Sequence, residues 1–134
     1  QIQAVLTQTF FSMKKEFSAI AGATELIHKL KQKSQVVLAT NPIWPLAVTE
    51  MRLALIGLQP SDFALITHNE NMATVKPDPE YFQELLTKLK ISADECVMIG
   101  DNPLKDGVAA LAKIRTILVD KNKPLLSQLD GIVL

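Results

Sequence analysis

Apolar residues gather in four short runs along the chain, separated by longer stretches of mixed character. The runs are "VVLAT" (36–40), "FALIT" (63–67), "CVMIG" (96–100) and "RTILV" (115–119), and a weaker run, "GIVL" (131–134), closes the chain. Most of them are nearly continuous and do not alternate with polar residues, which is typical of strands covered on both faces. The pattern predicts the strands of a buried parallel sheet.

The stretches between the runs have the spacing of helices. Apolar residues recur three and four positions apart within residues 47–58, 82–89 and 104–112, which predicts amphipathic helices. Two of these helices also have start signals, because Asp78 and Asn102 are good N-cap residues and each precedes a proline. Strands that alternate with helices predict a three-layer α/β domain with a parallel sheet in the middle.

Length, charge and cysteine content narrow the class of protein. A chain of 134 residues suits one modest domain, and fourteen basic residues against fourteen acidic ones leave no net charge. Such a balance disfavours nucleic acid and membrane surfaces as partners. Cys96 is the only cysteine, so no disulfide within the chain is possible and we expect a cytoplasmic protein with a buried thiol.

Polar residues of an unusual kind follow three of the predicted strands. The first strand ends in Thr40 and Asn41, the second leads to Lys76 just before a proline, and the third runs into Asp101 with Asp106 five positions later. Each residue taken alone has an ordinary interpretation as a turn residue or a solvated lysine. Because the carboxyl ends of parallel strands meet at one edge of a sheet, we expect these five side chains to converge.

Two neighbouring carboxylates call for a cation, because close like charges repel. Mg²⁺ is the natural candidate, since it takes oxygen ligands and is usually held by one or two carboxylates together with a substrate phosphate. A hydroxyl, an amide, a lysine and an acidic pair are together suited to stabilising the charge of a phosphoryl group. The residues therefore favour a phosphate-handling site with Asp101 and Asp106 as the metal ligands.

Three segments resemble the second, third and fourth motifs of the haloacid dehalogenase-like (HAD) superfamily, especially its phosphoglycolate-phosphatase-like members. They are "VVLATN", "VKPDPEYF" and "VMIGDNPLKDGVAALAKIRTILV", in the family's order, and the likeness runs from about Gly22 to Val119. The resemblance implies a Rossmann-like core, Mg²⁺ dependence and hydrolysis of phosphate esters through an aspartyl-phosphate intermediate.

The resemblance also implies a role for each of the five residues. Thr40 would hydrogen-bond the transferring phosphoryl group with help from the Asn41 backbone, and Lys76 would neutralise charge on the nucleophile and the phosphoryl oxygens. Asp101 would hold Mg²⁺, and Asp106 would either bind the metal through water or position Lys76. The substrate would be a small phosphorylated metabolite.

The family's first motif, an Asp-x-Asp pair at the end of a central strand, does not occur in these residues. Without that strand the sheet would have two unpaired inner edges. We therefore expect an upstream segment of the same protein, or a complementing chain, to supply the strand and the nucleophile. On this view residues 1–20 are the end of a helical cap, residues 21–134 are a partial Rossmann-like core, and the fragment alone is inactive.

Two other functions are compatible with the same residues. A HAD-like module that has lost its nucleophile would bind phosphate ligands or regulate a partner without turnover. A HAD-type dehalogenase or phosphonatase would keep the fold and change the chemistry, although the acidic pair favours the phosphatase branch.

Overall fold

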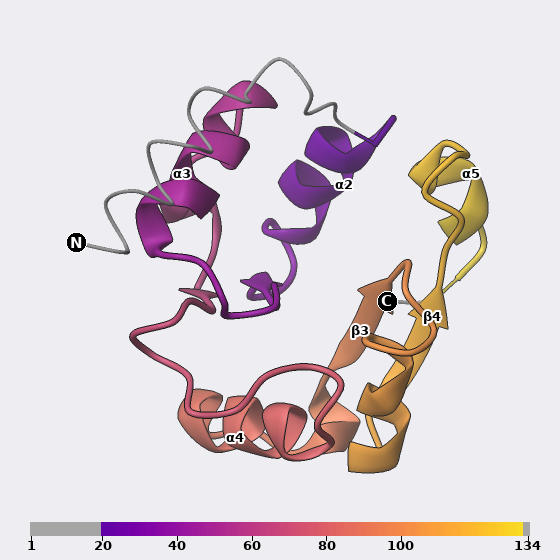
Figure 1. The fold of residues 1–134 in the computed structure, drawn as a ribbon. Coiled ribbons are helices and arrows are strands. Elements are labelled where there is room, and N and C mark those ends of the chain that lie inside the picture. Colours follow the sequence, from indigo (N-terminus) through magenta and orange to yellow (C-terminus); the bar gives the residue numbers. More distant parts are fainter. Residues whose placement is uncertain (1–19, 133–134) are drawn as a thin grey trace.

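The computed structural model describes residues 20–132, which Figure 1 draws in colour. The predicted end of a cap, residues 1–20, lies outside the described residues except for Ile20. None of the described helices is long and apolar enough to cross a membrane.

The four predicted strands are present, although they are shorter than the apolar runs. They form two parallel pairs, in which Val37 lies opposite Leu65 and Val97 lies opposite Arg115. Their bounds are β1 (Val37–Leu38), β2 (Leu65–Ile66), β3 (Val97–Gly100) and β4 (Arg115–Leu118).

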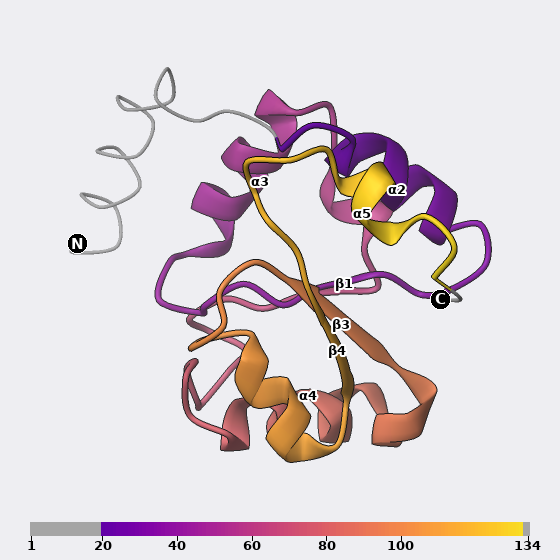
Figure 2. The same cartoon turned by 90° about the vertical axis from the view of Figure 1, so that its right-hand side faces the viewer.

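Helices cover both faces of the strands, as the alternating pattern predicted. Figure 2 shows α4 and the 3₁₀ helix η4 on one side of the strands, with α2, α3 and α5 on the other. The three-layer α/β fold is thus confirmed. The α-helices are α2 (Ala23–Leu30), α3 (Leu46–Leu55), α4 (Glu80–Leu89) and α5 (Leu125–Leu129), and the 3₁₀ helices are η2 (Pro60–Asp62), η3 (Ala93–Glu95) and η4 (Gly107–Ala112).

Two predicted elements differ in the structure. The stretch 104–112 is a turn followed by η4, although Asn102 still acts as a cap, its side-chain oxygen accepting the N–H groups of residues 104 and 105 at 3.0 Å. The described part of "GIVL" is not a strand. Gly131 has a φ of 72°, and the Ile132 N–H donates to the Leu129 carbonyl at 3.1 Å, which closes a turn after α5.

Packing on two faces explains why the strands are apolar throughout. Met98 packs against the cluster formed by α4 and η4, whereas its neighbour Ile99 packs against the cluster formed by α2 and α5. Similarly, Val37 contacts the first cluster while Leu38 contacts a third cluster around Phe63. Each strand therefore buries apolar side chains in both directions, as strands between two helical layers must.

The two strand pairs are not joined by a ladder of hydrogen bonds. Among the described residues, β1 pairs only with β2, and β3 pairs only with β4. This is the arrangement expected of a parallel sheet that lacks its central strand. The first cluster nevertheless spans both pairs, since Val37, Leu65 and Met98 all pack against it.

Candidate functional site

Lys76 lies at the carboxyl ends of β1 and β3 and links the two strand pairs. The residue is buried, with 8% of its surface exposed. Its Nζ donates to Asp106 Oδ1 at 2.6 Å and to the Ala39 carbonyl at 2.8 Å. The carbonyl belongs to the residue that follows β1, and Asp106 belongs to the loop after β3. The structure thus brings the predicted lysine and one predicted aspartate together across 30 residues of sequence.

Asp106 is also buried, and both of its carboxylate oxygens are bonded. Oδ1 meets Lys76, while Oδ2 accepts the backbone N–H groups of Asp101 at 3.1 Å and Asn102 at 3.0 Å. Two roles were expected for Asp106, and its contact with the Lys76 ammonium is the geometry that the positioning of Lys76 would require. The charge of Asp106 is balanced by the ammonium beside it and by the amides of its own loop.

Gly100, the last residue of β3, makes room for Asp106. A Cβ atom added at Gly100 would lie 2.5 Å from the Cβ, Cγ and Oδ2 atoms of Asp106. Such a distance is far inside van der Waals contact, so only glycine fits here. Gly100 was not among the predicted site residues, although its position directly before Asp101 was a usable signal.

The Asn41 side chain serves the backbone of Lys76. Its Nδ2 donates to the Lys76 carbonyl and its Oδ1 accepts the Lys76 N–H, both at 3.2 Å. The amide group thus fixes the loop that presents Lys76. The contribution that Asn41 can make to a ligand is therefore its backbone N–H group.

Thr40 is held by its carbonyl, which accepts hydrogen bonds from Thr67 Oγ1 at 2.6 Å and Tyr81 Oη at 3.0 Å. Neither Thr67 nor Tyr81 was predicted to belong to the site. Both are fully buried beneath the strand end.

Asp101 lies at the end of β3 and is exposed, unlike Asp106. Its carboxylate is therefore the one that can reach a ligand at this edge. The described residues contain no group of three or more His, Cys, Asp or Glu side chains that could hold a metal. One free carboxylate with a second close by is still the donor set that Mg²⁺ commonly uses together with phosphate and water. The residues present fit that ion, with the exposed Asp101 carboxylate available as a ligand and Asp106 behind it.

Glu84 anchors the segment that leads to Lys76. Its carboxylate accepts the N–H groups of Ala73 and Thr74 at 2.8 and 2.9 Å, and the Thr74 hydroxyl at 2.6 Å. Burial opposes the charge, but these hydrogen bonds outweigh it and lower the pKa of Glu84. This segment is thus tied to α4, and the last tied residue lies two positions before Lys76.

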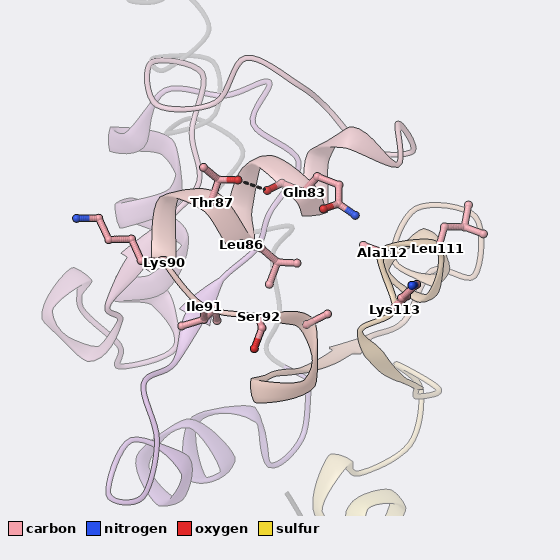
Figure 3. A pocket seen from close by; sticks show the side chains of 10 residues that line it. Gln83, Leu86, Thr87, Lys90, Ile91, Ser92, Leu111, Ala112 and Lys113 are labelled. Atoms are coloured by element: carbon pink, nitrogen blue, oxygen red, sulfur yellow. Dashed lines mark hydrogen bonds between the residues drawn. The ribbon is translucent and has the colours of Figure 1, made fainter.

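A surface pocket of about 490 Å³ lies at the other end of the strands (Figure 3). It is formed by the last turns of α4 and η4, and Ser92, which precedes β3, contributes to its wall. Figure 3 shows the Lys90 side chain pointing away from Lys113, so the two ammonium groups do not converge. The pocket is separate from the Lys76 site, and we assign no function to it.

Comparison with known proteins gives the family from the sequence, and solved structures resemble the fold. A family profile described as "Haloacid dehalogenase-like hydrolase" matches residues 2–119. The phosphoserine phosphatase of Thermus thermophilus is 28% identical over 119 residues, which cover 87% of this chain and 46% of that protein.

Two solved structures resemble the fold. A HAD-superfamily hydrolase of subfamily IA, variant 1, from Geobacter sulfurreducens has a TM-score of 0.66 and 22% identity, over 80% of this chain and 53% of that one. A HAD family enzyme from Bacteroides thetaiotaomicron, in complex with magnesium and inorganic phosphate, has a TM-score of 0.59 and 21% identity, over 76% and 53% of the two chains. The chain therefore spans about half the length of the proteins it matches.

We expect Gly100→Ala to lower the free energy of unfolding by about 1–3 kcal/mol, because the new methyl group would push Asp106 off its amides. Urea unfolding would measure the loss. Gly107→Ala is the matched control, since no atom lies within 4 Å of a Cβ there, and it should be nearly neutral. Equal effects of the two substitutions would contradict the close packing of Gly100 and Asp106.

We also expect acid to release the segment held by Glu84. Because the folded pKa is lowered, the stabilisation is present above the unfolded value of about 4.3 and is lost as the pH falls through the folded pKa. Protection of the Ala73 and Thr74 amides against hydrogen exchange, corrected for intrinsic rates, should fall in that range. In Glu84→Gln the same amides should be poorly protected at neutral pH, and unchanged protection there would refute the anchor.

Proposed function

Because the chain belongs to the haloacid dehalogenase-like hydrolase family, we propose that the full-length protein is a Mg²⁺-dependent phosphatase. Its substrate would be a small phosphorylated metabolite, hydrolysed through an aspartyl-phosphate intermediate. The observation that carries this proposal is the buried Lys76 ammonium, held between Asp106 and Ala39 beside Thr40 and Asn41. The relative named phosphoserine phosphatase supports the same class of reaction.

The geometry of Lys76 suits a group that stabilises developing negative charge. An ammonium has three N–H donors, and the two bonds to Asp106 and Ala39 occupy two of them. Within residues 20–132 this leaves one donor for a phosphoryl oxygen or for the attacking carboxylate. Because the ammonium is already fixed and mostly desolvated, little reorganisation is needed when charge develops in the transition state.

The other residues would bind and orient the phosphoryl group. The Thr40 hydroxyl and the Asn41 N–H would donate to its oxygens, and Asp101 would hold Mg²⁺, with Asp106 fixing Lys76 from behind. When bound, Mg²⁺ would offset the charge of the phosphate oxygens. All of these groups follow the carboxyl ends of β1, β2 or β3.

The nucleophile is proposed to lie upstream of Gln1, on a strand that pairs between β1 and β3. The support is the pairing of the described strands, in which β1 and β3 each have a single partner. A natural upstream sequence with an apolar strand ending in Asp-x-Asp would support the phosphatase. A strand that ends without aspartate would favour the inactive, phosphate-binding alternative.

We expect the full-length protein to hydrolyse p-nitrophenyl phosphate and members of a metabolite-phosphate panel when Mg²⁺ is present. Asp101→Asn should lower kcat by about 10²-fold or more, because the exposed carboxylate holds the metal. Lys76→Ala should abolish turnover as well, but it leaves Asp106 charged and unpaired and should cost about 3–5 kcal/mol of stability.

Asp101→Asn is therefore the sharper test, because its side chain is exposed and the fold should survive. Asp94→Asn and Lys33→Ala, two exposed positions that precede β3 and β1 at the opposite end of the strands, are the controls. Steady-state kinetics with circular dichroism would separate lost turnover from lost fold. A wild-type protein without activity on the panel would reject the phosphatase, and full activity in Asp101→Asn would reject the site.

A further inference from the structure

We propose that Tyr81 and Thr67 are positioning residues, which hold the Thr40–Asn41 peptide so that its N–H group faces the phosphoryl group. The inference rests on the proposed function. It concerns two hydroxyls from different parts of the chain: Thr67 follows β2, and Tyr81 lies in the first turn of α4.

Both side chains are in the interior, and each has 0% of its surface exposed. Thr67 Oγ1 lies 2.6 Å from the Thr40 carbonyl oxygen and 3.2 Å from that of Leu38. Tyr81 Oη lies 3.0 Å from the Thr40 carbonyl and 3.0 Å from Thr67 Oγ1. Two buried hydroxyls therefore converge on one backbone carbonyl at the end of β1.

The Thr40 carbonyl can accept a hydrogen bond from each hydroxyl, and in the contact between Thr67 and Tyr81 either hydroxyl could be the donor. Each hydroxyl has one proton, and a carbonyl oxygen can accept two hydrogen bonds, so Thr40 can accept one bond from each partner. Burial raises the pKa of Tyr81 to about 12, which keeps the phenol a donor at every physiological pH. A carbonyl held by two buried donors cannot rotate without breaking both bonds in a place that water does not reach.

The direction of this carbonyl fixes the direction of the next N–H group. A trans peptide is planar, and its C=O and N–H bonds point to opposite sides. Since the Thr40 carbonyl points inward to Tyr81 and Thr67, the Asn41 N–H points outward from the strand end. That is the direction in which a phosphate bound at this edge would lie.

Tyr81 also lies close to the Lys76 ammonium. The Nζ atom of Lys76 is 5.7 Å from the centre of the Tyr81 ring, within the range of a cation–π contact. The same Nζ donates to the carbonyl of Ala39, the residue before Thr40. The Tyr81 side chain thus contacts both the Lys76 ammonium and the Thr40–Asn41 peptide that we propose to bind phosphate.

The test compares four variants of the full-length protein. Tyr81→Phe and Thr67→Val each remove one hydroxyl and keep most of the side chain's volume. We expect each to lower kcat by about ten-fold with little change in KM, because a correctly directed N–H matters most in the transition state. Affinity for orthovanadate, an analogue of that state, should fall by a similar factor. Thr67→Ser keeps the hydroxyl and should retain kcat within about two-fold.

The fourth variant, Leu86→Val, controls for lost stability. Leu86 lies on the same helix and in the same core cluster as Tyr81, and truncating it should destabilise the fold without touching Thr40. Urea unfolding would measure the free energy of unfolding of each variant, so that variants of similar stability can be compared. A drop in kcat in Leu86→Val as large as that in Tyr81→Phe would overturn the inference, as would full activity in Tyr81→Phe.

A second readout does not depend on turnover. The Asn41 amide resonance should shift when inorganic phosphate is added to the wild type, and this response should be lost in Tyr81→Phe. If the wild type hydrolyses no phosphate ester, the proposed function fails while this titration still decides the inference. An Asn41 amide that responds equally in both proteins, or in neither, would overturn it.

Discussion

A buried ammonium bonds to both halves of the described domain. Within residues 20–132 no strand ladder connects the β1–β2 pair with the β3–β4 pair, yet Lys76 bonds the carbonyl after β1 and the carboxylate after β3. Removing a charge from water is costly unless it is paired and hydrogen-bonded, and here both conditions are met. The loops on either side must therefore take the conformations that supply those partners.

Several residues around Lys76 hold its hydrogen-bond partners in place. Gly100 leaves space for Asp106, the amides of Asp101 and Asn102 hold the far carboxylate oxygen, and Asn41 fixes the backbone of Lys76 itself. Among the described residues, every fully buried side-chain polar atom has a hydrogen-bond partner. A network without an orphaned group has few alternative arrangements, which is the property a preorganised charge site needs.

Sequence patterns predicted the parts of this arrangement that follow from local periodicity. Continuous apolar runs marked β1 to β4, and the motifs at their ends marked Lys76 and Asp106 and indicated the family, which the profile match confirms. Thr67 and Tyr81 were not predicted, because their partner is the Thr40 backbone carbonyl in a distant part of the sequence, and no local spacing signals such a contact. The side-chain amide of Asn41 was predicted to face a ligand. Its partner in the structure is the Lys76 backbone, and a contact across 35 residues of sequence leaves no local signal.

The two hydrogen bonds from Thr67 and Tyr81 to the Thr40 carbonyl do not depend on pH in the physiological range. A threonine hydroxyl does not titrate in water, and burial raises the pKa of Tyr81 to about 12, so neither donor changes its charge at physiological pH. The shape of the strand end is consequently the same throughout the range in which cells live. An acid or alkaline limb in a rate profile would then report on other groups, not on the two hydroxyls that hold the Thr40 carbonyl.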